Sequence, residues 1–333
     1  MDVRKQIVLG LIAFGAIGLA GCPKPDAPAP TSGGAQPAAG GQSGKLTIAV
    51  IPKGTENQFW KSINAGAEAA CKEEGCEVKW IGPNPENDIT QQVNIVNNQV
   101  SGKVNGIVIA ACDKTALVDP IKKAIAAGIP VVTIDSGVTG DDPVAYIATN
   151  NVKGGEAAAD KLAELMGDKG TAGFLIFGKG QVSSDEREEG FRNGMKKHTG
   201  IKVIEPLEAS DATKAFDNVT NLLTAHPEIT GIFAASEPNG ISAAAVLDQK
   251  KLAGKIKLVA FDASDKEIEA LKAGTIQALI VQDPYQMGYK GVKTALMAIK
   301  KQPITEKLVD SGLKVVTKEN LETPEIQKLL HPQ

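Results

Sequence analysis

Short apolar segments alternate with longer segments of helical period along almost the whole chain from Lys45 onward, and this alternation restricts the fold more than any other feature. The short segments are apolar at nearly every position, so they predict strands that are buried on both faces. They span residues 46–51, 77–82, 106–111, 130–135, 145–149, 172–178, 202–207, 231–236, 257–262 and 276–282. Strands of this kind, each followed by a helix, predict an α/β protein with doubly wound parallel sheets.

Helices of about 10 to 18 residues are predicted between these strands. They span residues 57–73, 88–101, 115–127, 153–166, 184–197, 212–225, 239–251 and 284–300. One open sheet would be long for so many strands, whereas two sheets of about five or six strands suit a chain of 333 residues. Two lobes are therefore predicted. No Pro/Gly/Ser-rich linker separates them, so short crossings should join them.

The N-terminus has the pattern of an export signal. Arg4 and Lys5 precede an apolar run from Ile7 to Ala20, which is too short to span a bilayer comfortably. The run ends in Leu-Ala-Gly-Cys and resembles the bacterial lipobox, so residues 1–21 are predicted to be a signal peptide and Cys22 to be lipidated. The alternative is a buried cysteine at the end of a core helix.

Residues 23–44 consist almost wholly of Pro, Ala, Gly, Ser and a few other polar residues. Such a segment cannot form a core, so residues 22–44 are predicted to be a lipidated cysteine followed by a disordered linker. The globular part should then lie outside the cytoplasmic membrane, in the periplasm or at the cell surface, anchored to the membrane through lipid.

Charge and motif content argue against several function classes. The net charge of −3 gives no basis for binding nucleic acid. There is no GxSxG, HExxH, CxxC or strand-following GxGxxG motif, and the 3 His and 4 Cys are too scattered for a zinc module. An enzyme, a cofactor and a metal site are therefore not expected. Cys71 and Cys76 could form a small disulfide in an oxidising compartment, a question that the sequence leaves open.

Polar and aromatic residues follow the first strand, where ligands bind in open parallel sheets. Lys53 and Asn57 can donate hydrogen bonds there, and Phe59 and Trp60 can stack on the apolar face of a small ring. Both rings could instead be core residues at the helix start. We expect one ring to belong to the core and the other to face a ligand.

Further polar residues lie at later strand ends. Asp135 and Ser136 follow the fourth strand, Gln282 ends the last one, and Asp262 is free for a ligand because Ser264 is better placed to cap the next helix. Arg187 lies near a helix start, where a cation opposes the helix dipole, so it has another purpose or pairs with a neighbouring glutamate. Together these residues suit a neutral, hydroxyl-rich small molecule.

Several segments resemble the type I periplasmic sugar-binding proteins, and the ribose-binding pattern is the nearest. The resemblance covers residues 45–317. Its segments are TIAVIPKGTENQFW, VVTID, EREEGF, NLLTAHPEITGIFAAS, FDASDKEIEALKAG and IVQDPYQMGYKGV. It implies two Rossmann-like lobes, each with a parallel sheet, joined by a three-segment hinge.

The resemblance also implies lobe boundaries. The N-terminal lobe should comprise residues 45–148 plus 283–307, and the C-terminal lobe residues 149–282 plus 308–333. The hinge crossings should lie near Ala148 to Asn150, Gln282 to Pro284 and Lys307 to Val309.

Ligand contacts carried over from the family are Asn57, Phe59, Trp60, Asp135, Arg187, Ser236, Asp262 and Gln282. This chain departs from the ribose-binding pattern at Lys53, Ser136, Ser210 and Ser236. The pattern has a small hydroxyl residue, an arginine, an aromatic residue and an asparagine there, in that order. Changes at hydrogen-bonding positions can change the ligand altogether.

The function implied is that of a monomeric, lipid-anchored protein that captures a monosaccharide or similar polyol by hinge closure and delivers it to an ABC permease. The alternatives are a sensor that presents its ligand to a chemoreceptor or sensor kinase, and a binder of a non-sugar small molecule. The tail after Val316 is predicted to contain a short helix.

Overall fold

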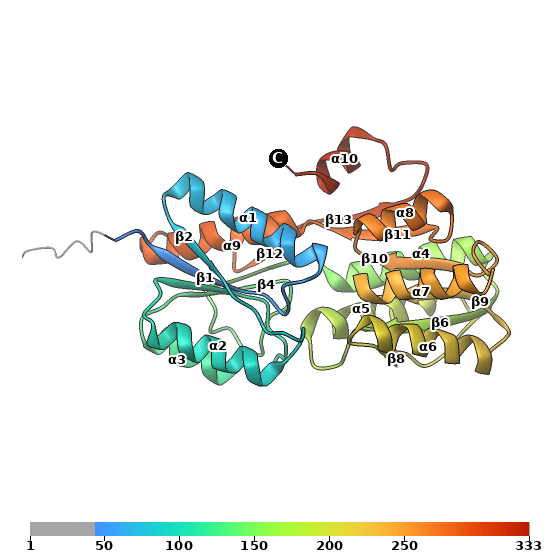
Figure 1. Ribbon diagram of the computed structural model, residues 1–333, viewed down its shortest axis with the longest axis horizontal. Coiled ribbons are helices and arrows are strands. Elements are labelled where there is room, and N and C mark those ends of the chain that lie inside the picture. The colour runs from blue at the N-terminus through green and yellow to red at the C-terminus, as the bar shows by residue number, and fades with distance from the viewer. Residues whose placement is uncertain (1–43, 333) are drawn as a thin grey trace, which may run out of the picture. The chain divides into compact units, whose positions relative to one another are not determined.

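Two β-sheets with helices on both faces make up residues 44–332, the part of the chain that the computed structural model describes (Figure 1). The sequence predicts sheets of this kind because its strands are apolar at nearly every position. In the strand Gly106–Ile109, for example, all four residues are buried. The prediction of an α/β fold with two lobes is confirmed. The signal peptide, Cys22 and almost all of the linker lie outside the described residues.

The first lobe contains a six-stranded parallel sheet in the order β12-β5-β4-β3-β1-β2. Its strands are β1 (Thr47–Ile51), β2 (Glu77–Trp80), β3 (Gly106–Ile109), β4 (Val131–Ile134), β5 (Ala145–Ala148) and β12 (Leu308–Asp310). Its helices are α1 (Gln58–Glu74), α2 (Ile89–Ser101), α3 (Val118–Ala126) and α9 (Pro284–Ile299). Helix α9 packs against α1 and against the inner strands β3 and β4, although it is distant from them in sequence.

The second lobe contains a seven-stranded sheet in which six strands follow the order β13-β11-β10-β9-β6-β7, and β8 also pairs with β6. Its strands are β6 (Gly170–Ile176), β7 (Ile201–Val203), β8 (Leu207–Glu208), β9 (Ile229–Ala234), β10 (Lys257–Phe261), β11 (Ala278–Gln282) and β13 (Leu313–Val316). Its helices are α4 (Asn151–Met166), α5 (Val182–Met195), α6 (Ala212–Ala225), α7 (Glu237–Gln249), α8 (Asp265–Ala273) and α10 (Pro324–Leu330). All pairings are parallel except that of β13 with β11.

The chain passes between the two sheets at three places within residues 44–332. The first two crossings are residues 149–150, between β5 and α4, and Asp283, between β11 and α9. The third crossing is residues 311–312, which lies beyond the predicted range of Lys307 to Val309. The reason is that β12 pairs in parallel with β5, with Leu308 opposite Tyr146, so residues 308–310 belong to the first lobe.

Close contacts between helices fix the helix starts that face the other lobe. A methyl group added at Gly288 would overlap the carbonyl oxygen of Ile63, and one added at Gly190 would overlap that of Val152. The backbones of α1 and α9 therefore touch at Gly288, and those of α4 and α5 touch at Gly190. Only glycine permits such an approach.

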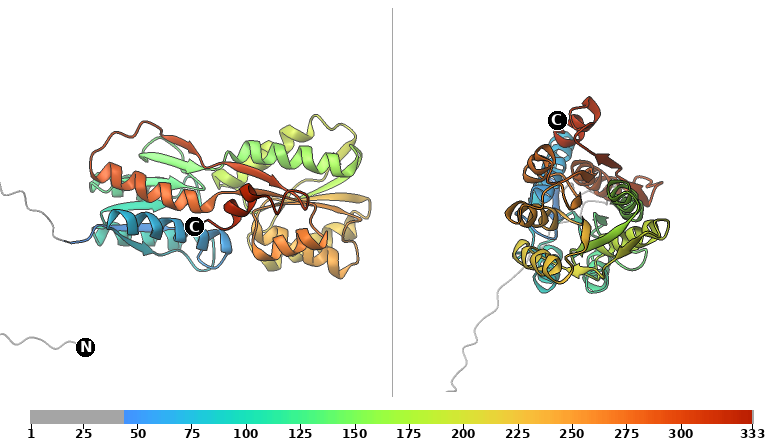
Figure 2. Two further views of the ribbon diagram at one scale, coloured as in Figure 1. Left: turned by 90° about the horizontal axis from the view of Figure 1, so that it is seen from above. Right: turned by 90° about the vertical axis from the view of Figure 1, so that its right-hand side faces the viewer.

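The predicted C-terminal helix is present as α10, and the segment that carries it is anchored in the second lobe. Leu321 and Ile326 are buried in the core that α7, β9 and β10 share. Figure 2 shows α10 near the middle of the molecule when it is seen from above. Its residues Lys328 and Leu329 line a cavity together with residues of the second and third crossings.

The sequence left open whether two cysteines of the first lobe form a disulfide, and the structure shows that they do. Cys71 and Cys76 form a disulfide that joins the end of α1 to the segment leading into β2. Cys112 is free and buried. Among residues 44–332, no helix combines the length and the apolar character needed to cross a membrane.

Candidate ligand-binding site

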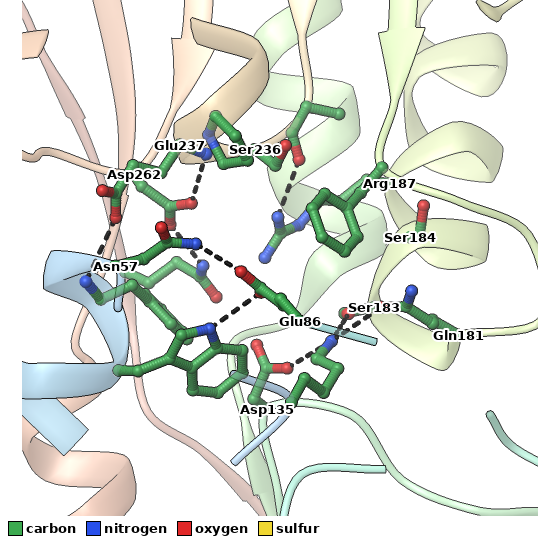
Figure 3. Close-up of a pocket in the computed structure, with 17 residues that line it drawn as sticks. Asn57, Glu86, Asp135, Gln181, Ser183, Ser184, Arg187, Ser236, Glu237 and Asp262 are labelled. Atoms are coloured by element: carbon green, nitrogen blue, oxygen red, sulfur yellow. Dashed lines mark hydrogen bonds and ion pairs between the residues drawn. The ribbon is translucent and has the colours of Figure 1, made fainter. Parts of the chain in front are cut away.

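A cavity lies between the two lobes, at the carboxyl ends of their strands (Figure 3). Its lining consists of Lys53, Asn57, Phe59, Trp60, Glu86, Asp135, Phe177, Gln181, Ser183, Ser184, Arg187, Ala235, Ser236, Glu237, Pro238, Asp262 and Gln282. Nine of the ten residues predicted to bind the ligand are among them. The tenth, Ser136, does not line the cavity. It is fully buried, and its hydroxyl accepts a hydrogen bond from the backbone N–H of Ser183 across 3.4 Å.

Two aspartates occupy equivalent places in the two lobes. Asp135 follows β4 and Asp262 follows β10, and each of these strands is third from the edge in its sheet. Both residues have a left-handed backbone, with φ of 55° and 82°. Such a conformation is disfavoured in non-glycine residues and tends to occur at functional sites. Each backbone N–H bonds to the neighbouring strand, at Ile147 and Ile280 respectively.

Lys53 connects the lobes. Its ammonium lies 2.7 Å from a carboxylate oxygen of Asp135, and both side chains are almost fully buried. It also donates hydrogen bonds to Gln181, across 3.0 Å, and to Ser183, across 3.2 Å, both at the start of α5 in the second lobe. Burying an ammonium is unfavourable unless it is paired in this way. Lys53 therefore holds the two lobes together at this edge of the cavity.

Glu86, which sequence reasoning missed, lies in the loop between β2 and α2 and binds two of the predicted residues. Its carboxylate accepts a hydrogen bond from the Asn57 amide across 2.6 Å and from the Trp60 indole N–H across 2.9 Å. Burial raises the pKa of Glu86, although the Trp60 bond and the charge of Lys53 oppose this.

Both aromatic rings of α1 line the cavity, so the expectation that one belongs to the core and the other faces a ligand does not describe the structure. Trp60 is also part of the core of the first lobe, and Phe59 packs against that core. The two rings meet edge to face, with centroids 4.9 Å apart. In the second lobe, Phe177 lines the cavity and Ser210 does not.

Arg187 reaches the cavity from the second turn of α5. It donates to the side chain of Asn151 and to the carbonyl of Ala235, each across 2.8 Å, and its guanidinium lies 3.7 Å from the centroid of the Phe261 ring. No ion pair joins it to an adjacent glutamate among residues 44–332. Burial lowers the pKa of Arg187, while the charge of Asp262 opposes this change.

Asp262 is held by neighbours in its own lobe. It accepts hydrogen bonds from the Gln282 amide across 2.6 Å and from the backbone N–H of Glu237 across 3.1 Å. Burial raises its pKa, while the nearby Arg187 lowers it. Ser264 caps α8 in a capping box with Glu267. The prediction that Ser264 is the cap and Asp262 is not is therefore confirmed.

Glu237 supplies a cap from the second lobe to a helix of the first. Helix α1 begins after Asn57, whose side chain makes no capping bond. The carboxylate of Glu237 instead accepts from the backbone N–H groups of Gln58, across 3.4 Å, and Phe59, across 3.2 Å. Burial and the charge of Asp262 raise the pKa of Glu237 to about 7. The start of α1 thus depends on contact between the lobes.

Apart from Asp135 Oδ2, which is paired with the Lys53 ammonium, two buried polar atoms in the cavity wall have no hydrogen-bond partner among the described residues. They are the hydroxyl of Ser236 and the side-chain oxygen of Gln282, and both are buried. An unpaired buried polar group costs about 1 to 3 kcal/mol. A polar solute with hydroxyl groups could satisfy both atoms, and the rings of Phe59, Trp60 and Phe177 could cover its C–H surfaces.

The polar and aromatic lining residues that sequence reasoning missed are Glu86, Phe177, Gln181, Ser183, Ser184 and Glu237. Two simple signals were available, because Phe177 directly follows β6 and Glu237 directly follows the strand-end residue Ser236. Glu86 lies in a loop with no comparable signal.

The polar groups of this site suit recognition of a polar solute. They are amides, hydroxyls, the Lys53–Asp135 ion pair and the hydrogen-bonded charges of Glu86, Arg187, Glu237 and Asp262. Residues 44–332 contain no group of three or more His, Cys, Asp or Glu side chains that could hold a metal ion. Two lobes with parallel sheets, joined by three crossings and facing each other across a polar cavity lined with rings, define a solute-binding protein.

Comparison with known proteins identifies the family. The periplasmic binding protein domain matches residues 48–317, so the chain belongs to the periplasmic binding protein family, whose members bind solutes and are not enzymes. The fold is the type I fold, and the chain is of the ribose-binding-like group that the sequence analysis predicted.

Three relatives illustrate the match. The ribose import binding protein of Salmonella typhimurium is 32% identical over 274 residues, which cover 80% of this chain and 90% of that protein. A carbohydrate transporter solute-binding protein of Agrobacterium radiobacter, solved with D-arabinose, is 35% identical with a TM-score of 0.84 and covers 87% of this chain and 100% of its own. An ABC transporter solute-binding protein of Agrobacterium vitis, solved with D-fucose, is 36% identical with a TM-score of 0.83, covering 86% and 100%.

Proposed function

We propose that this protein is the monosaccharide-binding component of an ABC importer. The observation that carries the proposal is the pair of strand-end aspartates, Asp135 and Asp262, which enter one ring-lined cavity from equivalent places in the two lobes. Carboxylates accept hydrogen bonds from paired hydroxyl groups, and aromatic faces cover the C–H surface of a sugar. The relatives support the same class, since they include a ribose import binding protein and solute-binding proteins solved with D-arabinose and with D-fucose.

The ligand contacts in this proposal are the polar groups that line the cavity and the three rings. Asp135, Asp262 and Arg187 bind hydroxyl groups, and Ser236 and Gln282 gain the partners that the protein does not supply. The serine at position 136 lies behind the wall, so its role is to hold the backbone of Ser183.

Capture occurs by closure of the lobes about the three crossings. Closure brings Lys53 to Gln181 and Ser183, and Glu237 to the start of α1. These bonds form only when the lobes meet, so they stabilise the form of the protein that encloses the sugar. The importer would recognise that form.

Export and lipid anchoring form the second part of the proposal. The signal peptide pattern and the Leu-Ala-Gly-Cys sequence support lipidation of Cys22, with residues 23–44 as the tether. Mass spectrometry of the membrane-bound protein tests this directly. We expect acyl chains on Cys22, and we expect Cys22→Ser to release the protein from the membrane fraction. Membrane retention of the Cys22→Ser protein would contradict lipid anchoring.

A thermal-shift screen tests the binding function. The probes are D-ribose, D-allose, D-arabinose and D-fucose, with myo-inositol and free amino acids as comparison. A ligand at 100 times its Kd stabilises the folded protein by about 2.7 kcal/mol, so the matching sugar should raise the Tm by about 5 °C.

Asp262→Asn is the matched variant, because it keeps the shape of the side chain and removes its charge. We expect it to abolish the sugar-induced rise in Tm. A rise with an amino acid and with none of the monosaccharides would contradict the proposal.

A further inference from the structure

The carboxylate of Glu86 is hydrogen-bonded to two other residues that line the cavity. One carboxylate oxygen accepts from the Trp60 indole N–H, and the other lies 2.6 Å from the amide nitrogen of Asn57 (Figure 3). An indole N–H can only donate, and the second carboxylate oxygen of Glu86 accepts from the amide nitrogen of Asn57. The NH₂ group of Asn57 must therefore face Glu86.

This orientation decides which atom of Asn57 is left for a ligand. The residue is at the N-cap position of α1, but its side-chain oxygen makes no capping bond, because Glu237 supplies the cap from the other lobe. Within residues 44–332, the side-chain oxygen of Asn57 accepts no hydrogen bond. Asn57 lines the cavity, so its free group there is an acceptor.

We propose that Glu86 is a positioning residue that determines specificity: it fixes the amide of Asn57 so that an oxygen faces the cavity. The ligand must then present a hydrogen-bond donor at this point, such as a sugar hydroxyl. An analogue with an acceptor alone there, such as a fluorine or an O-methyl group, is rejected. The inference rests on the proposed sugar-binding function and adds the residue that sets its donor and acceptor pattern.

An exchange of the two polar groups tests the inference. In Glu86→Gln, the new amide must turn its oxygen to the Trp60 indole, so its NH₂ faces Asn57 and turns the Asn57 amide over. A donor then faces the cavity. We expect the affinity for the bound sugar to fall at least about tenfold. The NH₂ group of Asn57 then either faces the donor of the sugar or is left without a partner. Asn57→Asp alone places two carboxylates together and should also weaken binding.

The double variant Glu86→Gln with Asn57→Asp restores the pattern with the same total charge. The amide at position 86 donates to one oxygen of the carboxylate at position 57, and the other oxygen faces the cavity as an acceptor. We expect the double variant to bind within about threefold of the native affinity, although each single variant is weaker. Glu56→Gln, an exposed neighbour, is the control for loss of one charge.

Affinities are measured by isothermal titration with those sugars among D-ribose, D-allose, D-arabinose and D-fucose that bind the native protein, and with their monodeoxyfluoro derivatives. Glu86→Gln should reduce the difference in affinity between one sugar and one of its fluoro derivatives. The double variant should increase this difference again. Binding by Glu86→Gln within threefold of native, or a double variant weaker than both single variants, would overturn the inference.

A ligand-free measurement separates this inference from the proposed function. In ¹H–¹⁵N spectra, the side-chain amide signal of Asn57 should move in Glu86→Gln and stay in place in Glu56→Gln. If no sugar binds the native protein, the proposed function fails, and this signal still decides whether Glu86 orients Asn57. An unmoved Asn57 signal in Glu86→Gln would refute the positioning role.

Discussion

The burial of Glu237 beside Asp262 predicts that the folded, closed protein loses stability relative to the unfolded chain as the pH rises. Glu237 is 7% exposed and lies near the charge of Asp262, and the pKa of its carboxyl group in the closed structure is about 7 instead of 4.5. The higher pKa means that the closed form prefers the neutral carboxyl group. The stabilisation is therefore complete below pH 4.5 and is lost as the pH rises through about 7.

The size of the effect follows from the two pKa values. A tenfold change in an equilibrium is worth about 1.4 kcal/mol, so ionisation of Glu237 lowers the stability of the folded, closed protein relative to the unfolded chain by about 3 kcal/mol. Between about pH 5 and about pH 8, the contribution of this residue should fall by about 2.5 kcal/mol. Other carboxylates titrate as well, so the quantity to measure is the difference between the native protein and Glu237→Gln.

Urea denaturation of both proteins from about pH 5 to about pH 8 measures this difference. Glu237→Gln keeps a neutral group at the site at every pH, so its stability relative to the native protein should rise by about 2.5 kcal/mol across the range. Glu269→Gln, on the exposed side of α8, controls for the loss of one carboxylate. A difference between native and Glu237→Gln that stays constant with pH would refute the reasoning.

Three further predictions concern stability. Gly288→Ala should lower the free energy of unfolding by about 1 to 3 kcal/mol in urea denaturation, because the methyl group forces α1 and α9 apart. Replacing both Cys71 and Cys76 by alanine should lower the free energy of unfolding by about 2 kcal/mol, since the disulfide joins cysteines with a sequence separation of only 5. Lys53→Met should lower it by about 3 kcal/mol by leaving Asp135 buried without its cation, and adding Asp135→Asn should recover a large part of that loss in a double-mutant cycle.

Each of these predictions has an outcome that contradicts it. Gly137→Ala adds a methyl group at ordinary contact distance from Tyr146, so an equal loss in Gly137→Ala and Gly288→Ala would exclude helix packing as the cause. An unchanged Tm after reduction of the disulfide would contradict the second prediction. Additive effects of the Lys53 and Asp135 changes would show that the ion pair does not couple them.

The sequence predicted the α/β fold well because a strand buried on both faces has to be apolar at every position, and this pattern is visible without a structure. The segment predicted as one strand over residues 202–207 is two short strands, β7 and β8. The edge strands β12 and β13 were missed, since β12 is only three residues long and is partly exposed. The third crossing was misplaced for this reason.

The sequence predicted those residues of the cavity wall that lie at strand ends. Asp135, Asp262 and Gln282 follow or end central strands, so the topology alone brings them together. Glu86 and Gln181 lie in loops whose path depends on packing between distant segments, and no local pattern marks them. Ser136 shows the opposite error, since it was predicted to contact the ligand and does not line the cavity. It directly follows the lining residue Asp135 in sequence, but its side chain is buried behind the cavity wall.

The three crossings also have a consequence for the order in which the lobes fold. Residues 151–282 contain the second lobe almost complete, with only β13 and the C-terminal segment still to come. The first lobe begins at the N-terminal end of the described chain, yet it lacks α9 until residue 299 has been made, so α1, β3 and β4 have no partner on that side. Domains usually fold in the order of their synthesis. Here the lobe that is begun first still lacks α9 when the second lobe has been made almost complete.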